Sequence, residues 1–332
     1  MSFEDITGHA REKEILEKAI SAGRVAHSYL FTGPEGIGKR SLAREFAGAL
    51  NCAGSGAPCG ACEDCRLVRS ATHPNLIEVW PEDKDGVRTV AGLIRIARVR
   101  ELQDAIKYKS TGGKKVVIVD GADKMEQRAA NALLKTLEEP PPDSVIILIS
   151  SKPGSLLSTI ISRCQRIIFR PLPEELVREF LVKSNMAAPD DAGRIARLSA
   201  GSIASAVKYS EDGVFEKRRE IVERLSGLDG DDTAGLFAFA GELSARGDLG
   251  EVLEFLKLWC RDVMVFSEGA GELMVNADLE GFIKAAPAPK ALADSFDMIE
   301  KARYDVTPPR YANKLLAMEA LLMGLAGKGA LI

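Results

Sequence analysis

Residues 28–43 read SYLFTGPEGIGKRSLA. The short apolar run at 29–31 predicts a buried strand, the glycine-rich segment 33–39 a tight turn, and the residues after it a helix with Leu42 and Phe46 on its apolar face. Glycines let backbone N–H groups point inward around an anion, and the start of a helix adds positive potential there. Strand, turn and helix in this order predict a P-loop, in which Lys39 neutralises the β- and γ-phosphates of a nucleotide.

One position departs from the P-loop pattern. A Ser or Thr normally follows the lysine, where its hydroxyl ligates Mg²⁺, but this chain has Arg40. Ser41 comes one residue later and points about 100° further round the helix. Two interpretations stay open: the loop holds ATP or ADP, or it holds only a phosphate. In both cases the usual magnesium-ligating hydroxyl is missing. The candidate binding residues of the loop are Gly33, Gly36, Gly38, Lys39, Arg40 and Ser41.

The length and composition describe an ordinary globular protein. A chain of 332 residues predicts two or three domains, and a formal net charge of −4 excludes a global positive field that would draw it onto nucleic acid. No apolar run reaches the roughly 18 residues of a membrane span, and the N-terminal residues lack the features of a signal peptide. We therefore expect a cytoplasmic protein without membrane association, whose six cysteines are thiols or metal ligands.

Four of these cysteines lie within fourteen residues: Cys52, Cys59, Cys62 and Cys65. Two overlapping C-x₂-C steps plus a fourth cysteine are typical of tetrahedral Zn–S₄ coordination. With four protein ligands the zinc ion has no open position, so the predicted site is structural rather than catalytic. The alternatives are four free thiols or a redox pair. His73 is followed by Pro74 and is interpreted as a turn residue rather than a further ligand.

A second apolar run at 116–120 predicts a buried parallel strand that ends in Asp120. In P-loop enzymes an Asp at this place holds Mg²⁺, and the next residue is commonly a Glu that orients the attacking water. Here Gly121 follows, so Asp120 joins the candidate nucleotide-binding residues while the glutamate is missing. Asp123, three residues further on, is a candidate cap for the next helix.

The remaining pattern predicts an α/β region followed by an all-α region. Helices are expected at 12–22, 94–109 and 131–139, strands at 145–149 and 167–169, and Ser162, Arg163 and Cys164 on a short helix between these strands. From residue 171 the expected elements are all helical, at 173–184, 190–198, 203–209, 215–225, 233–246, 249–267, 290–303 and 309–325. We therefore expect a nucleotide-binding domain over 1–170 with the cysteine module at 52–65, a small helical domain over 171–209, and an all-α domain over 210–332.

Residues 95–115 carry seven basic side chains against two acidic ones, Glu101 and Asp104. This surplus fits two interpretations equally: a patch that contacts phosphates of nucleic acid, or the solvated face of a helix.

Several segments together resemble the AAA+ clamp-loader subunits of bacterial DNA polymerase III. They are AHSYLFTGPEGIGK at 26–39, the four-cysteine insert, HPNLIEV at 73–79, NALLKTLEEPP at 131–141 and TIISRCQ at 159–165. The resemblance covers almost the whole chain and is weakest after about residue 210. It implies an AAA+ P-loop domain with a zinc insert, a small helical lid and a C-terminal helical collar.

The resemblance also implies roles for single residues. In this family the arginine of Ser-Arg-Cys is an arginine finger that reaches the ATP of a neighbouring subunit, and Arg163 matches it. Its alternative is an arginine at a helix end, paired with local carboxylates. The lid helix of active members carries a sensor arginine where this chain has Ala204, whereas Ser150 and Ser151 keep a polar residue at the first sensor position.

Three losses, at Arg40, Gly121 and Ala204, favour a subunit that has given up hydrolysis but completes a neighbour's site. The implied partners are the gamma and tau ATPase subunits and the delta subunit in a hetero-pentamer, with the sliding clamp and primer-template DNA reached through the complex. The second hypothesis is an active AAA+ ATPase subunit, which Lys39 and Asp120 favour. The third is a nucleic-acid-binding scaffold outside replication, against which the acidic balance argues.

Overall fold

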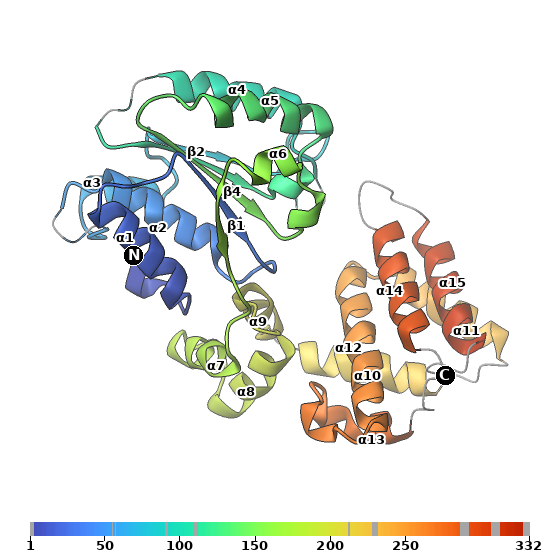
Figure 1. Ribbon diagram of the computed structural model, residues 1–332. Coiled ribbons are helices and arrows are strands. Elements are labelled where there is room, and N and C mark those ends of the chain that lie inside the picture. Colours follow the sequence, from blue (N-terminus) through green and yellow to red (C-terminus); the bar gives the residue numbers. More distant parts are fainter. Residues whose placement is uncertain are drawn as a thin grey trace. The chain divides into compact units, whose positions relative to one another are not determined.

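The computed structural model describes residues 3–54, 56, 58–89, 92–108, 110, 112–211, 213–227, 232–285, 292–306 and 313–327. The chain divides into two compact units, Met1–Ser210 and Glu211–Ile332 (Figure 1). The boundary falls next to the one predicted between the second and third domains. A further division at residue 170 stays a prediction.

The first unit is built on a five-stranded parallel sheet in the order β2-β3-β4-β1-β5. The strands are β1 (Ser28–Thr32), β2 (Leu76–Val79), β3 (Lys115–Asp120), β4 (Ser144–Ser150) and β5 (Gln165–Ile168). Strands β1, β3 and β4 are almost wholly buried, as expected for a parallel sheet with both faces covered. Because parallel strands end at one edge, Thr32 lies beside Ser150, and Asp120 lies beside Ile149. This edge carries the P-loop.

Helices cover both faces of the sheet (Figure 1). Leu16, Phe46 and Val68 pack one face, from α1 (Ala10–Ser21), α2 (Lys39–Asn51) and α3 (Glu63–Arg69). The other face is covered by α4 (Ile96–Lys107), α5 (Gln127–Glu138) and α6 (Ser158–Ile161). Short 3₁₀ turns are η1 (Phe3–Asp5), η2 (Ala122–Lys124) and η3 (Pro153–Ser155). The predicted α/β fold is confirmed.

Three helices complete the first unit: α7 (Glu174–Lys183), α8 (Pro189–Leu198) and α9 (Ile203–Tyr209). Ser202 is the N-cap of α9, and its side chain accepts a hydrogen bond from the N–H of Ser205. The N–H of Ala204 donates to the carbonyl of Gly36 at 3.0 Å. The start of α9 therefore lies directly on the P-loop.

The second unit is helical throughout its described residues. It contains α10 (Val214–Ser226), α11 (Thr233–Ala245), α12 (Leu249–Ser267), η4 (Gly271–Leu273), η5 (Ala277–Leu279), α13 (Glu280–Ala285), α14 (Leu292–Val306) and α15 (Lys314–Gly327). One hydrophobic core joins them, and it includes the buried Trp259 and Cys260 of α12. Because α13 has only six residues and few buried positions, the hydrophobic pattern did not indicate it.

A buried carboxylate organises this second unit. Asp262 is fully buried and accepts hydrogen bonds from the N–H of Val275 at 3.0 Å and from the N–H and Nδ2 of Asn276, both at 2.6 Å. The Oδ1 of Asn276 in turn accepts from the buried Arg218 at 3.1 Å. Asp262 thereby holds the segment before α13 against α12.

We predict that Asp262→Asn lowers the free energy of unfolding by about 1–3 kcal/mol, because an amide group would face backbone donors. Urea unfolding of the full chain measures the loss. The control is Arg219→Gln, which breaks an exposed ion pair with Glu223 in the same unit and should cost less than about 1 kcal/mol. Equal losses in the two variants would contradict this account.

Two local predictions are wrong. Ser162, Arg163 and Cys164 were expected on a helix, but α6 ends at Ile161 and they form the turn before β5. Asp123 does not cap α5; its Oδ1 accepts from the N–H of Ser151 at 3.1 Å and so ties η2 to the end of β4. In the part of the chain that the structure describes, every helix is too short or too polar to cross a membrane.

Candidate functional site

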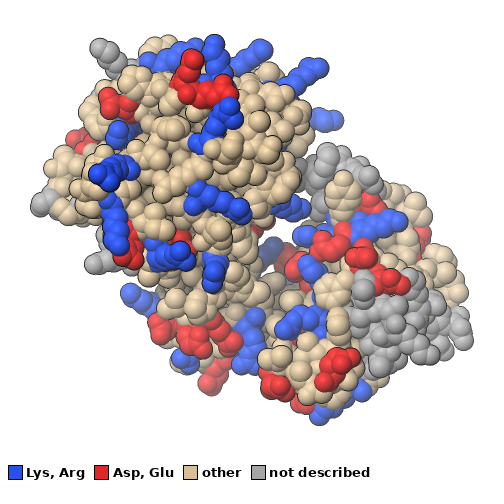
Figure 2. All heavy atoms as spheres, in the orientation of Figure 1, with Lys and Arg blue, Asp and Glu red and all other residues tan. Residues whose placement is uncertain are grey.

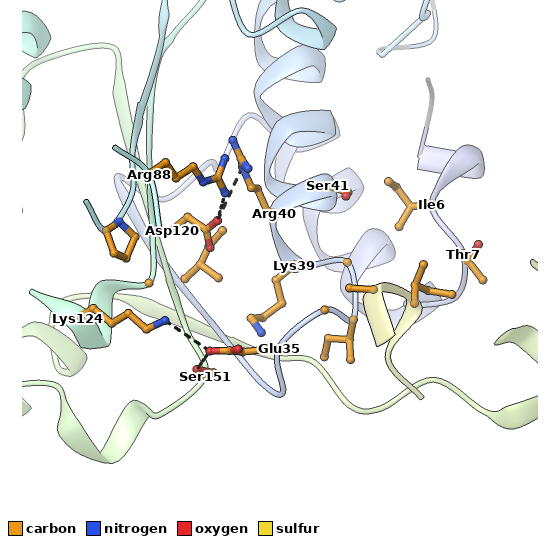
Figure 3. Close-up of a pocket in the computed structure, with 18 of the residues that line it drawn as sticks. Ile6, Thr7, Glu35, Lys39, Arg40, Ser41, Arg88, Asp120, Lys124 and Ser151 are labelled. Carbon is orange, nitrogen blue, oxygen red and sulfur yellow. Dashed lines mark hydrogen bonds and ion pairs between the residues drawn. The ribbon is translucent and has the colours of Figure 1, made fainter. Parts of the chain in front are cut away.

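A cavity of about 660 Å³ opens at the carboxyl edge of the sheet (Figure 3). Its lining comes from the N-terminal segment, the P-loop, the end of β3 and the start of α9. Of the predicted nucleotide-binding residues, it includes Gly36, Gly38, Lys39, Arg40, Ser41 and Asp120. Gly33 lies outside the lining and begins the turn, where its N–H donates to the carbonyl of Ser150 at 3.3 Å.

The glycines of the loop are needed for its shape. Gly36 and Gly38 have φ angles of 75° and 104°, which favour glycine. A Cβ on Gly36 would also lie 2.3 Å from Oγ of Ser202 and 2.7 Å from Cβ of Ala204. Any side chain here would therefore push α9 off the P-loop.

Lys39 is buried beneath the loop. Its Nζ donates to the carbonyl of Gly33 at 2.6 Å and to the carbonyl of Pro34. Burial lowers the pKa of Lys39, and the nearby carboxylates of Glu35 and Asp120 oppose this shift. The ammonium group is thus placed where a P-loop lysine meets phosphate.

Arg40 lies between two carboxylates. Its Nη2 is 3.2 Å from Oε2 of Glu78, and its Nε is 3.8 Å from Oδ2 of Asp120. The same Oδ2 accepts from Nη2 of Arg88 at 3.2 Å (Figure 3). The carboxylate predicted to hold magnesium is therefore bound by two guanidinium groups.

Glu78 anchors this arrangement from inside β2. Its side chain is 7% exposed and accepts hydrogen bonds from Arg44 as well as Arg40. Burial favours the neutral acid, but the hydrogen bonds from Arg44 and Arg40 outweigh it and lower the pKa of Glu78. A carboxylate within an otherwise apolar strand needs such partners, so its presence in LIEV was a signal that the sequence analysis missed. Arg88 gave no comparable signal, since it lies in a polar loop.

One of the two serines predicted for the first sensor position, Ser151, faces the P-loop. Ser151 donates from Oγ to Oε1 of Glu35 at 3.1 Å, and Nζ of Lys124 lies 3.7 Å from the same oxygen (Figure 3). Ser150 is fully buried, and its Oγ accepts from the N–H of Lys152. Of the two serines, Ser151 is the one that lines the cavity.

The four predicted metal ligands come together beyond the C-terminal end of α2. Cys52 follows its last residue, Cys62 is the N-cap of α3, and Cys65 lies in the first turn of α3. With Cys59, their sulfur atoms all lie within 4.8 Å of one another. Zinc with Zn–S bonds of about 2.3 Å places tetrahedral sulfurs about 3.8 Å apart, and the sulfurs of Cys52 and Cys62 are 3.8 Å apart. The cluster fits a tetrahedral metal ion.

Backbone donors favour the thiolate form that binds metal. The N–H groups of Gly54 and Cys59 point at Sγ of Cys52, at 3.3 and 3.4 Å. Donation from the N–H of Ala61, and then from that of Cys62, lowers the pKa of Cys59 to about 6, whereas burial raises the pKa of Cys65 to about 12.

His73 stands apart from the cysteine cluster. Its Nε2 lies 3.3 Å from Oδ1 of Asp64, and its Nδ1 accepts from the N–H of Asn75 at 3.1 Å. These contacts fit the turn residue that the sequence predicted.

Arg163 lies outside the cavity, in the turn between α6 and β5. Its carbonyl accepts from Oγ of the buried Ser28 at 2.6 Å, which holds the turn against the start of β1. Its guanidinium is 35% exposed, donates to the carbonyl of Thr159 at 3.0 Å, and pairs with Oε1 of Glu138 at 2.7 Å. The backbone of the turn is anchored by Ser28, while the guanidinium is held by the half-exposed Glu138 and the carbonyl of Thr159.

The profile of the family described as "DNA polymerase III, delta subunit" matches residues 8–173, half of the chain. The chain is 40% identical to subunit delta' of DNA polymerase III from Pseudomonas aeruginosa over 209 residues, 61% of each chain, and 33% identical to that of Bacillus subtilis over 285 residues, 82% of each chain. The chain belongs to the delta-prime subunits of the DNA polymerase III clamp loader.

Membership in the delta-prime family confirms the resemblance seen in the sequence and places the chain in DNA replication. The chain is also 30% identical to subunit tau of DNA polymerase III from Escherichia coli over 291 residues, which are 80% of this chain and 44% of tau. The delta-prime and tau relatives thus share most of the length of this chain.

The basic stretch of this delta-prime chain lies on and after α4. Lysine and arginine side chains gather along the edge of the first unit formed by α4 and α5 (Figure 2). Several have local partners: Nη2 of Arg98 is 3.0 Å from Glu82, Lys107 pairs with Asp104 at 2.8 Å, and Lys115 is buried against carbonyl oxygens. The contacts of Arg98 and Lys107 support the solvated-face interpretation for that part of the stretch, whereas Lys115 is buried and belongs to neither interpretation. Lys109 lies outside the described residues.

Proposed function

We propose that this delta-prime subunit does not hydrolyse ATP and instead supplies Arg163 to the ATP site of a neighbouring subunit during sliding-clamp loading on primed DNA. The gamma and tau ATPase subunits and the delta subunit would be its partners in a hetero-pentamer. The observation that carries the proposal is the position of Arg40, whose guanidinium faces Asp120 where a catalytic site needs magnesium.

Two further features agree with the loss of hydrolysis. Gly121 replaces the glutamate that would orient water, and Ala204 places a methyl group and a backbone N–H over the P-loop where active members carry an arginine. A transition state for phosphoryl transfer would lack its metal, its water-orienting base and one cation.

Arg163 is suited to act outside its own chain. Ser28 anchors its backbone, so only the side chain has to move. A half-exposed ion pair such as that with Glu138 contributes about 0–1 kcal/mol. A γ-phosphate carries more charge and accepts several hydrogen bonds, so it would displace Glu138 at small cost.

The second unit has surfaces suited to a helical collar. Helices α11 and α15 are apolar on most sides, yet they leave large apolar side chains in water: Phe237, Leu315, Leu316 and Met323. Helices that are hydrophobic all round are normally buried. We infer that other subunits of the ring cover these positions.

Turnover of the reconstituted loader tests the assignment. We expect Lys39→Ala in this subunit to leave DNA- and clamp-stimulated ATP turnover nearly unchanged, because its own P-loop makes no product. The matched comparison is the P-loop lysine of the tau subunit, whose replacement should abolish turnover at that site. A collapse of turnover with Lys39→Ala would instead support the active-ATPase hypothesis.

A further inference from the structure

We propose that the cavity binds the diphosphate group of a nucleotide without a divalent cation, and that Arg40 and Arg88 supply the positive charge that Mg²⁺ supplies elsewhere. The inference rests on the proposed absence of hydrolysis at this site, but it concerns binding alone.

The donor set does not fit magnesium. Mg²⁺ needs oxygen ligands in near-octahedral geometry at about 2.0–2.1 Å. In this chain the hydroxyl after Lys39 is absent, and Oδ2 of Asp120, the carboxylate predicted to hold magnesium, lies 3.2 Å from Arg88 and 3.8 Å from Arg40. Two cations at this oxygen would repel a third.

The arginines are held in place rather than neutralised. Among the described residues, the guanidinium groups of Arg40, Arg44 and Arg88 pair with two carboxylates, Glu78 and Asp120. The described residues that line the cavity include four basic side chains, Lys39, Arg40, Arg88 and Lys124, against three acidic ones, Asp5, Glu35 and Asp120. The lining therefore keeps an excess of positive charge, which a polyanion can neutralise.

Trp80 brings the two cavity arginines close together. Their guanidinium carbons lie 5.8 Å (Arg40) and 5.0 Å (Arg88) from the centre of its ring, within cation–π range. Burial, followed by the charge of Arg40, lowers the pKa of Arg88. The two cations repel each other and share Oδ2 of Asp120, which carries a single negative charge, so a further anion beside them would be favoured.

The rest of the cavity has room for a nucleoside. Its volume of about 660 Å³ falls within the range of about 300–1,000 Å³ that is usual for small-molecule sites. Across the P-loop from Arg88 and Asp120, Figure 3 shows Ile6 and Thr7, and Phe180 also lines this cavity. Apolar side chains on one side and arginines on the other match a base and a diphosphate.

Calorimetric titration of the purified full chain with ADP tests the proposal. The buffer is depleted of divalent cations beforehand and contains no chelator, so that any metal on the cysteine cluster stays bound. We expect wild type to bind ADP in this buffer, with an affinity that excess Mg²⁺ changes by less than about threefold. A parallel titration with pyrophosphate distinguishes a nucleotide from an inorganic diphosphate as the ligand. Tighter binding of ADP than of pyrophosphate shows that the nucleoside contributes, and equal binding identifies the diphosphate alone as the ligand.

Three variants locate the effect. Arg40→Thr restores the usual hydroxyl and should weaken metal-free binding about tenfold while making it respond to Mg²⁺. Arg88→Gln should weaken binding by a similar factor without rescue by Mg²⁺. Arg197→Gln is the control, since Arg197 lies on α8, pairs with Glu174 and does not line the cavity; its affinity should equal wild type. Thermal unfolding verifies that each variant is folded.

The proposal is overturned if wild type binds ADP only with Mg²⁺, or if neither ADP nor pyrophosphate binds. It is also overturned if Arg40→Thr and Arg88→Gln, both folded, bind as wild type does. None of these results bears on the effect of Arg163 on a neighbour's turnover, so the proposed function stands or falls separately.

Discussion

Replacing Arg163 with alanine is expected to lower the DNA- and clamp-stimulated ATP turnover of the reconstituted loader by about 10³-fold at the site that it completes. The physical reason is the loss of a guanidinium that stabilises charge on the transferred phosphoryl group. Steady-state phosphate release measures the change. Assembly of the complex should be unaffected, because the polar contacts of the Arg163 side chain with the described residues of its own chain are the ion pair with Glu138 and the hydrogen bond to the carbonyl of Thr159.

The matched control is Glu138→Gln, which breaks the same ion pair but leaves the guanidinium in place. Its turnover should stay within about twofold of wild type, since a half-exposed pair is worth little. If Glu138→Gln and Arg163→Ala reduced turnover equally, the ion pair itself would be what matters. Arg163 would then be an arginine paired with a local carboxylate, the alternative to an arginine finger. Unchanged turnover in Arg163→Ala would exclude the finger.

Replacing Cys62 with serine is expected to weaken zinc binding by at least about a thousandfold. Structural zinc sites in peptides bind with about 10–16 kcal/mol, and a hydroxyl is a far poorer ligand than a thiolate. Metal analysis of the purified chain should find one zinc ion in wild type and almost none in the variant. Hydrogen exchange should show faster exchange through α3, because Cys62 caps it and Cys65 lies in its first turn.

Cys164→Ser provides the control for this second experiment. Cys164 is a partly buried thiol of the same unit that lies outside the cluster, so its variant should retain one zinc ion and the exchange pattern of wild type. Wild-type protein that contains no metal, and in which Cys62→Ser leaves the exchange of α3 unchanged, would instead indicate free thiols.

Local patterns were sufficient for most of the fold. Buried parallel strands are continuous apolar runs, and helices long enough to show a repeat were found within a few residues of their bounds. The prediction for residues 162–164 failed because a four-residue helix leaves no periodicity from which to place its end. The prediction that Asp123 caps the next helix failed because its hydrogen-bond partner, Ser151, follows β4 and is distant in the sequence.

The sequence by itself determined the family, the P-loop, the four-cysteine cluster and the loss of the magnesium hydroxyl, because each depends on residue types at short, fixed spacing. Only the tertiary structure decided what Arg40 does. Its partners Glu78, Trp80, Arg88 and Asp120 come from β2, β3 and the loop between them. The parallel sheet brings these segments, which are distant in the sequence, to one edge. No pattern of residue spacing along the chain predicts that these side chains come into contact.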